Sequence, residues 1–287
     1  MGCAHGVGSA RRRGAQLGRR DLAGFIARIK CMVPLRKPIV WITGASSGIG
    51  RAVALRMARD GWQVVASARR PAVLQSLASE PAIPAGAIVP VPVDVTDRSS
   101  VAAAVAAIEA AHGPIDTAVL SAGTFKPLRA ASFSAAVVRE LLELNTLGTA
   151  NCLEALLPRM LERRGGRIVA VASMAGYRGM PTSAAYGASK AAVIHMVEAL
   201  IPELAGTGVI LQVANPGFIR TPLTDLNDFP MPFLMEVTDA ADALVRGMRT
   251  DRFEIAFPRS LMVVMKAARM LPAGLYLRLM RRLVPAP

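Results

Sequence analysis

Seven short apolar runs alternate with helix-length segments, and this alternation most constrains the fold. The runs lie at 38–43, 62–67, 88–93, 116–120, 167–172, 209–214 and 253–257. The helix-length segments lie at 48–60, 71–79, 97–112, 133–163, 183–204 and 239–249. Strands that are apolar at nearly every position are buried on both faces, and strands that alternate with helices form a parallel sheet. The sequence therefore predicts an α/β fold, a single doubly wound parallel sheet of about seven strands with helices on both faces. Pro90 and Pro92 leave the extent of the third strand open, because proline cannot donate to a strand ladder.

Charge is concentrated at the two ends of the chain. The 287 residues carry 34 Lys and Arg against 20 Asp and Glu, a formal net charge of +14. Nine basic residues and one acidic residue lie in 1–37, and six basic residues and no acidic residue lie in 259–287, so 38–258 is neutral. We expect three parts: a basic, disordered N-terminal extension (1–37), an α/β domain (38–258) and a basic amphipathic helical segment (259–287). A charge placed at the ends bears on where the protein docks rather than on its chemistry.

Cysteine and histidine usage argues against two classes of protein. The three cysteines, Cys3, Cys31 and Cys152, are scattered and form no C-x-x-C pair. This count and spacing predict neither a disulfide framework nor a zinc site, and they favour a reducing compartment. With only three histidines in the chain, we expect no metal site.

A glycine-rich turn follows the first predicted strand directly. Thr43-Gly44-Ala45-Ser46-Ser47-Gly48-Ile49-Gly50 leads from that strand into a helix-length segment. Glycines at these positions permit a tight turn, close approach of the backbone to a pyrophosphate, and close helix–strand packing. An ordinary strand-to-helix turn can look similar, but the position after the first strand of a βαβ unit favours dinucleotide binding.

The end of the second strand indicates which dinucleotide is bound. It reads Ala68-Arg69-Arg70, with no carboxylate to accept a hydrogen bond from a free ribose 2′-hydroxyl. Arg69 and Arg70 could instead pair with a 2′-phosphate, which favours NADP(H) over NAD(H), although two solvated loop arginines remain the alternative. Asp94, followed by Val95, is a candidate for the adenine edge, or else a cap for the next helix.

Tyr186 and Lys190 are the centre of the predicted catalytic site. At a spacing of i and i+4 they share one helix face, so the ammonium can lie beside the phenol and lower its pKa. Ser173 ends the fifth predicted strand, and Asn145 lies in the middle of a predicted helix. Ligands of open α/β sheets bind outside the carboxyl ends of the strands, where Ser173 and the glycine turn are expected.

In these motifs the chain resembles the short-chain dehydrogenase/reductase (SDR) family across residues 38–258. The family's T-G-x-x-x-G-I-G motif corresponds to Thr43 through Gly50, its Y-x-x-x-K motif to Tyr186 and Lys190, and its P-G turn to Pro216-Gly217, followed by Ile219 and Thr221. One departure is Leu120-Ser121-Ala122-Gly123, where the family has N-N-A-G, so support of the sheet by that asparagine is absent. The candidate cofactor-binding residues are Gly44, Ser46, Ser47, Gly48, Ile49, Gly50, Arg69, Arg70, Asp94, Val95, Ala122, Gly123, Asn145, Tyr186, Lys190, Pro216, Gly217, Ile219 and Thr221.

The resemblance implies a Rossmann-type fold and an NADP(H)-dependent oxidoreductase that interconverts C=O and CH–OH groups. It implies four catalytic residues: Tyr186 as general acid, Ser173 polarising the carbonyl oxygen, Lys190 tuning Tyr186 and holding the nicotinamide ribose, and Asn145 supporting a proton relay. An NADP-dependent alcohol dehydrogenase working in the oxidative direction and a non-catalytic dinucleotide-binding protein are the alternatives.

The segment after Pro216-Gly217 indicates an apolar, lipid-like substrate. It is rich in Met and Phe, which suits an adaptable apolar pocket, although the same residues could merely cover the edge of the core. The candidate wall residues are Phe125, Met174, Met180, Phe218, Leu223, Leu226, Phe229, Met231, Phe233, Leu234 and Met235.

The C-terminal segment 259–287 mixes apolar residues with cations, and Pro272 is expected to break its helix. Charged residues interrupt every apolar stretch before it reaches the roughly 20 residues needed to span a bilayer. We expect a peripheral contact with an anionic membrane; a dimer contact or a lid on its own domain are alternatives. We further expect a cytoplasmic homo-oligomer with no nucleic-acid partner.

Overall fold

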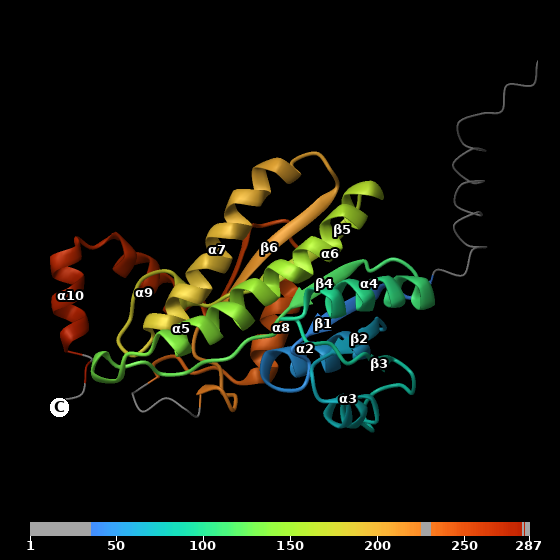
Figure 1. Ribbon diagram of the computed structural model, residues 1–287, viewed down its shortest axis with the longest axis horizontal. Coiled ribbons are helices and arrows are strands. Elements are labelled where there is room, and N and C mark those ends of the chain that lie inside the picture. Colours follow the sequence, from blue (N-terminus) through green and yellow to red (C-terminus); the bar gives the residue numbers. More distant parts are fainter. Residues whose placement is uncertain (1–35, 225–230, 283, 285–287) are drawn as a thin grey trace, which may run out of the picture. The chain divides into compact units, whose positions relative to one another are not determined.

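Seven parallel strands form one sheet in the order β3-β2-β1-β4-β5-β6-β7 in the computed structural model (Figure 1). The structure describes residues 36–224, 231–282 and 284, so nearly all of the basic N-terminal extension lies outside the described residues. The strands are β1 (Ile39–Thr43), β2 (Gln63–Ser67), β3 (Ile88–Pro90), β4 (Thr117–Leu120), β5 (Gly166–Val171), β6 (Val209–Pro216) and β7 (Glu254–Phe257). The predicted doubly wound parallel sheet is confirmed.

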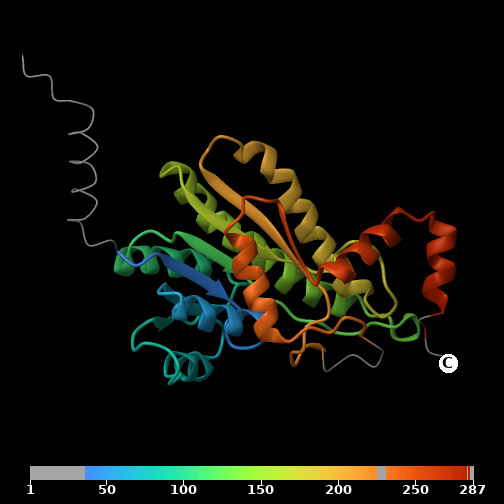
Figure 2. The same ribbon diagram turned by 180° about the vertical axis from the view of Figure 1, so that it is seen from behind.

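Helices cover both faces of this sheet, as Figures 1 and 2 show from opposite sides. One face carries α2 (Gly48–Arg59), α3 (Pro71–Ala78) and α8 (Val237–Met248), and the other carries α4 (Arg98–His112), α6 (Gly148–Glu162) and α7 (Ala184–Leu204). Alternate residues of β1 belong to the two cores, Val40 and Ile42 to the first and Ile39 and Trp41 to the second. Because side chains alternate across a strand, a strand between two cores is apolar throughout.

The third strand is shorter than the apolar run predicted for it, 88–93. β3 ends at Pro90, but the N–H groups of Val91 and Val93 still donate to Ala66 O and Ala68 O at 2.9 and 3.1 Å. Pro90 and Pro92 alternate with these donors. β3 is an edge strand, so the missing N–H groups fall on its unpaired side, where they interrupt no ladder.

The helix-length segment 133–163 is helical from 135 to 162, but a π-helical turn interrupts its α-helical geometry. The segment forms α5 (Ala135–Leu141), a π-helical turn η2 (Leu142–Leu147) and α6, after a short 3₁₀ turn η1 (Ala130–Ser132). Asn145 lies inside the π-helical turn and is fully buried. Single π-helical turns within helices are frequently found at functional sites.

Two further helices follow β7, namely α9 (Arg259–Met270) and α10 (Ala273–Arg281). They are separated at Leu271-Pro272, as the position of the proline predicts. We call them the C-terminal helix pair. Among the described residues, none of the helices combines the length and the apolar character needed to cross a membrane.

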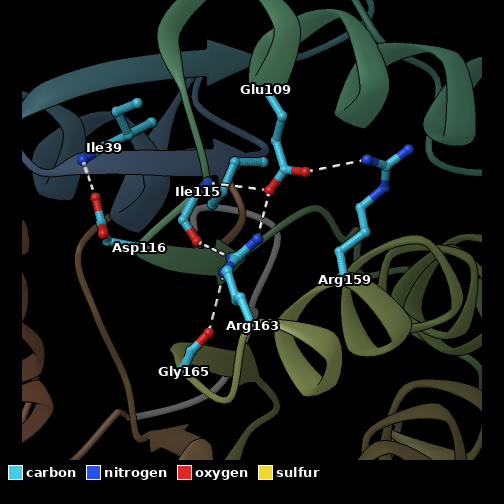
Figure 3. Close-up of polar contacts among 7 residues, drawn as sticks. All are labelled: Ile39, Glu109, Ile115, Asp116, Arg159, Arg163 and Gly165. Carbon is cyan, nitrogen blue, oxygen red and sulfur yellow. Dashed lines mark hydrogen bonds and ion pairs between the residues drawn. The ribbon is translucent and has the colours of Figure 1, made fainter.

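A polar cluster ties the elements together at the amino ends of the central strands (Figure 3). The Glu109 carboxylate accepts hydrogen bonds from Ile115 N–H at 3.1 Å, from Arg163 at 2.7 Å and from Arg159 at 3.1 Å. Arg163 also donates to the carbonyls of Ile115 and Gly165. This cluster joins α4, the approach to β4 and the end of α6, so we call it the amino-edge cluster.

Candidate active site

The glycine turn packs tightly against the end of β4. Gly44 and Gly48 have φ values of +69° and +52°, which side-chain-bearing residues rarely adopt. A Cβ atom on Gly44 would lie 2.7 Å from Ser121 O, and one on Gly50 would lie 2.5 Å from Gly44 O. Both positions therefore require glycine, for the turn and for close packing.

The Thr43 hydroxyl supports the same corner. Its Oγ1 accepts hydrogen bonds from the N–H groups of Ser121 and Ala122 at 3.1 and 3.3 Å. These contacts connect the ends of β1 and β4 directly. The departure from N-N-A-G therefore leaves the end of β4 held by a hydroxyl from the neighbouring strand.

A cavity of about 680 Å³ opens over the carboxyl ends of the strands, beside this turn. Most predicted cofactor-binding residues line it: Gly44, Ser46, Ser47, Gly48, Ile49, Arg69, Arg70, Asp94, Val95, Ala122, Gly123, Tyr186, Lys190, Pro216 and Thr221. Four predicted residues do not, namely Gly50, Asn145, Gly217 and Ile219. Gly50, Asn145 and Ile219 are buried, so none of them reaches the cavity.

Several lining residues were not predicted as cofactor-binding. Most of them lie at a strand end or within four residues after it, and Leu144 lies in the π-helical turn. The set is Ser67, Ala68, Val93, Ser121, Thr124, Leu144, Val171, Ala172, Pro222 and Leu223. The general rule that ligands bind at the carboxyl ends of parallel strands could have found those at strand ends. Their residue types carry no chemical signal of their own.

The second strand delivers its arginines to this cavity. Arg69 and Arg70 follow β2 and are exposed where they line it. Asp94 also lines it, but its Oδ1 accepts hydrogen bonds from the N–H and hydroxyl of Thr96 at 3.0 and 2.8 Å. The N-terminus of α4 is capped by Asp97, so Asp94 does not have the capping role that was considered for it.

Two of the predicted catalytic residues, Tyr186 and Lys190, line this cavity, whereas Ser173 does not. Tyr186 and Lys190 both come from α7, with the Lys190 ammonium 5.9 Å from the centre of the Tyr186 ring. Lys190 Nζ donates to Val171 O at 2.8 Å. Ser173 follows β5, and its Oγ accepts a hydrogen bond from Ala175 N–H at 3.1 Å.

Asn145 is fully buried and contacts both α7 and the segment that follows β4. Its Oδ1 accepts from Thr124 N–H at 2.8 Å, while its Nδ2 donates to Thr124 O at 3.0 Å and to Ser189 Oγ at 2.9 Å. A Cβ atom on Gly123 would lie 3.0 Å from Asn145 Oδ1 and 3.3 Å from Lys190 Nζ. Glycine at 123 therefore lets the π-helical turn, β4 and α7 come together.

The pKa of Tyr186 shifts in the opposite direction from the one predicted. Burial raises the pKa of the Tyr186 phenol, and the hydrogen bond with Ser173 offsets only part of this shift. Burial also lowers the pKa of Lys190, to about 8. The expectation that the neighbouring ammonium dominates is wrong, because the effect of burial on the phenol outweighs that of its polar neighbours.

A second, smaller cavity of about 90 Å³ meets the first at Tyr186 and Leu223. Phe125 packs edge-on against Tyr186, with ring centres 5.2 Å apart. The lining residues are Phe125, Ser173, Met174, Ala175, Met180, Ser183, Tyr186, Gly217, Phe218, Leu223, Thr224, Leu261 and Met265. None of these described wall residues carries a charge, so the cavity suits an apolar group.

The predicted wall was partly right. Phe125, Met174, Met180, Phe218 and Leu223 line the small cavity. Four others, Met231, Phe233, Leu234 and Met235, do not line it. Leu226 and Phe229 lie outside the described residues.

Leu261 and Met265 were missed as wall residues. Both come from α9, in the segment predicted to contact a membrane. Their i, i+4 spacing was the available signal, but a helical apolar stripe does not reveal what it packs against.

A parallel sheet with a glycine turn, a large cleft at its carboxyl edge and an adjoining apolar cavity defines a dinucleotide-binding oxidoreductase. The comparison with known families agrees. The family model described as short chain dehydrogenase matches residues 38–228. The chain belongs to the short-chain dehydrogenase/reductase family, which binds a nicotinamide dinucleotide, and it is an enzyme of that type.

Individual relatives are consistent with this family. An uncharacterized oxidoreductase of Myxococcus xanthus is 40% identical over 242 residues, which covers 84% of this chain and 96% of the relative. Ketoacyl reductase HetN of a Nostoc species is 32% identical over 228 residues, covering 78% of this chain and 79% of the relative. Among solved structures, an actinorhodin polyketide ketoreductase with NADPH superposes with a TM-score of 0.69 at 26% identity, covering 77% of this chain and 95% of that one.

Proposed function

We propose that this protein uses NADPH to reduce a ketone or aldehyde on an apolar, lipid-like substrate, with Tyr186 as the proton donor. One observation carries the proposal: Tyr186 lies where the large cavity and the apolar cavity meet. Ser173 lines the apolar cavity next to it. A carbonyl group placed there would have its oxygen near both hydroxyls.

The cavity residues fit a nicotinamide dinucleotide. Gly44, Gly48 and Gly123 line the cavity without placing a side chain in it, and α2 begins at the turn, where its N-terminus can receive a pyrophosphate. Arg69 and Arg70 would hold a 2′-phosphate, which favours NADP(H) over NAD(H). The similar ketoreductase structure with NADPH supports the same choice.

The residues of this chain would orient the substrate and move a proton. When bound, the reduced dinucleotide supplies the hydride for the carbonyl carbon. Ser173 would hydrogen-bond the carbonyl oxygen, and Tyr186 would donate its phenolic proton to that oxygen. Lys190 would hold the dinucleotide's ribose beside Tyr186, and Asn145 would keep the Thr124 backbone and α7 in place around them.

The raised pKa of Tyr186 suits its proposed role as the general acid of the reduction. A phenol with a raised pKa is protonated at neutral pH, and a general acid must begin the reaction in that state. An alcohol dehydrogenase would need the same group deprotonated. Lys190, with a pKa lowered to about 8, is still mostly cationic at pH 7.

The walls of the small cavity favour an uncharged, apolar substrate. Phe125, Met174, Met180, Phe218 and Leu223 surround the position next to Tyr186. Methionine side chains adapt to different apolar shapes. The similar protein named ketoacyl reductase makes a keto group on an acyl chain a suitable first candidate.

Replacing Tyr186 with Phe tests the proposal. Tyr186→Phe should bind NADPH as the wild type does, but kcat with an aliphatic ketone should fall by about 10² to 10⁴-fold because the proton donor is lost. NADPH oxidation measures turnover, and quenching of protein fluorescence measures cofactor binding. Near-normal turnover in this variant would exclude Tyr186 as the donor. A wild type that binds NADPH but turns over no carbonyl would favour the non-catalytic alternative.

We also propose that the C-terminal helix pair contacts an anionic membrane surface and that the protein acts as a cytoplasmic homo-oligomer. Among the described residues, seven of the eleven exposed large apolar side chains lie between 263 and 284. The segment 259–287 carries six basic residues and no acidic residue. Exposed apolar side chains among cations suit the interface of an anionic bilayer. A two-fold contact between copies through α10 would instead bring Arg278, Arg281 and Arg282 against like charges.

Sedimentation with lipid vesicles tests the membrane contact. The wild type should bind vesicles containing phosphatidylglycerol and not those of phosphatidylcholine alone, and Arg278→Glu combined with Arg281→Glu should abolish binding. Glutamate at Arg59 and Arg246, two exposed arginines of other helices, is the matched control. Equal binding by both double variants would reject this surface. Light scattering on a sizing column measures the oligomeric state.

A further inference from the structure

Two segments that are distant in the sequence form neighbouring walls of the apolar cavity. The first is the loop between Ser173 and Tyr186, which contributes Met174, Met180 and Ser183. The second is α9, which contributes Leu261 and Met265. Met174 and Leu261 are both buried in one apolar cluster with Tyr177. The relative position of these segments therefore sets the shape of the cavity.

Arg178 joins these two segments. Its Nη1 donates to Ala268 O at 2.7 Å, to Leu271 O at 2.8 Å and to Arg269 O at 3.1 Å. These are carbonyls at the C-terminal end of α9, where intrahelical partners run out and where the helix dipole favours a cation. Arg178 thus caps α9 from the loop that carries part of the active site.

The same side chain also reaches α10. The Arg178 guanidinium lies over the Tyr276 ring, 3.9 Å from its centre. Tyr276 is only 3% exposed, and its hydroxyl donates to Gly179 O at 2.7 Å. A planar guanidinium can donate hydrogen bonds in its plane while stacking on a ring, which a lysine ammonium cannot do.

A second set of contacts ties α9 to the sheet. Glu254 of β7 accepts hydrogen bonds from Lys266 of α9 and from the Tyr177 hydroxyl, one residue before Arg178. The hydrogen bonds to Glu254 lower its pKa although burial acts to raise it, so the carboxylate remains charged. α9 is therefore held on two sides. Arg178 is the residue that connects it to both the loop and α10.

We propose that Arg178 is a positioning residue that sets substrate selectivity by holding the C-terminal helix pair against the loop between Ser173 and Tyr186. This inference rests on the proposed reduction of an apolar carbonyl compound. A short substrate is held mainly next to Tyr186 and Ser173. A longer chain extends along the cavity and needs Leu261 and Met265 in place.

The test is steady-state reduction of a series of aliphatic ketones of increasing chain length by the full chain. For Arg178→Ala, we expect KM to rise about 10-fold for the longest ketones while kcat stays within about twofold, and KM for the shortest ketone to stay within about twofold. Arg178→Lys should fall between wild type and Arg178→Ala, because it keeps the charge but loses the stacking. Arg246→Ala, which removes an exposed arginine of α8, should match the wild type. The same loss for every chain length, or no loss at all, would overturn the proposal.

Hydrogen–deuterium exchange gives a readout that does not depend on the reaction. Amides of α9 and α10 should exchange faster in Arg178→Ala, whereas those of α8 should not change. Tyr276→Phe, which removes only the hydrogen bond to Gly179 O, should produce a smaller change in the same helices. Unchanged exchange in α9 and α10 would reject the role of Arg178. If the wild type reduces no apolar ketone, the proposed function fails, and the exchange data still decide whether Arg178 holds the helix pair.

Discussion

The amino and carboxyl edges of the sheet differ in how many hydrogen-bonding partners their charged side chains have. At the amino edge, the Glu109 carboxylate has three hydrogen-bonding partners, and Arg163 bridges that carboxylate to two backbone carbonyls (Figure 3). At the carboxyl edge, Lys190 is only 5% exposed and donates to Val171 O, and it forms no ion pair with any of the described residues. The Oδ1 of Asn215 near the same edge is buried without a partner among the described residues.

This difference shows where the fold is stabilised and where it is prepared for a ligand. Removing one member of a well-paired, partly buried cluster leaves its partners unsatisfied and destabilises the folded state, whereas a buried charge with few partners itself costs free energy. At the amino edge, the Glu109 carboxylate is held by three hydrogen-bonding partners. The carboxyl edge holds glycines, a desolvated lysine and a desolvated tyrosine around open cavities.

The largest expected effect comes from removing the carboxyl-edge charge. Lys190→Met should lower kcat by about 10² to 10⁴-fold, because proton transfer loses its supporting cation. The same variant should unfold at an equal or higher urea concentration, since replacing a poorly paired buried charge with an apolar side chain can stabilise by about 1 kcal/mol or more.

Lys126→Met is the control for that stability measurement, because Lys126 is half exposed in a surface ion pair with Glu140. It should change neither turnover nor the urea midpoint appreciably. A Lys190→Met protein that is clearly less stable than the wild type would contradict the proposed contrast between the two edges.

The second effect concerns stability at the amino edge. Glu109→Gln should lower the free energy of unfolding by about 1 to 3 kcal/mol, because it weakens hydrogen bonds to two guanidinium groups in a partly buried place. Urea unfolding measures it, and kcat of the folded protein should not change. Glu140→Gln, in the exposed pair with Lys126, should cost no more than about 1 kcal/mol. Equal losses in these two variants would show that the amino-edge cluster has no special role.

The third effect concerns cofactor choice at the carboxyl edge. Arg69→Ala should raise KM for NADPH by about 10-fold or more and leave KM for NADH nearly unchanged, because only NADPH carries the 2′-phosphate. Steady-state kinetics with both cofactors measure this. Arg59→Ala, an exposed arginine at the end of α2, is the control. If Arg69→Ala weakens both cofactors equally, the arginine is not a 2′-phosphate ligand.

The smallest effects are in the pH dependence of stability. Burial acts to raise the pKa of Glu109, but hydrogen bonds from Ile115 N–H, Arg163 and Arg159 lower it below its usual value of about 4.5. The contribution of Glu109 to the free energy of unfolding is therefore present above pH 4.5 and is lost as the pH falls below that value. Lys190 has a pKa of about 8 in the folded protein against 10.5 when unfolded. Between these values the unfolded state binds more protons, so the free energy of unfolding should rise with pH.

The acid limb and the alkaline limb of the curve of unfolding free energy against pH can each be assigned with a single variant. Glu109→Gln should flatten the acid limb only, and Lys190→Met should flatten the alkaline limb only. Urea unfolding across the pH range measures both. A profile in which either variant leaves its own limb unchanged would show that another group titrates there.

Much of the fold and of the site could be predicted from local patterns. The alternation of apolar runs with helix-length segments predicted the parallel sheet, and the glycine spacing predicted the turn at Gly44 to Gly50. The helical spacing of Tyr186 and Lys190 predicted that they share one face of α7. These features depend on steric limits and hydrogen bonds within a few residues, which the order of side chains decides directly.

Other features depend on which distant surfaces meet, and only the tertiary structure decided them. The π-helical turn around Asn145 forms where that side chain bonds to Thr124 and Ser189. The upward pKa shift of Tyr186 depends on how completely the surrounding elements exclude water. Leu261 and Met265 form an amphipathic stripe in the sequence, but they become cavity walls because Arg178, from a segment some 90 residues earlier, holds their helix in place. A sequence determines which face of a helix is apolar; the packed fold determines what that face covers, because burial and desolvation arise only when separate elements come together.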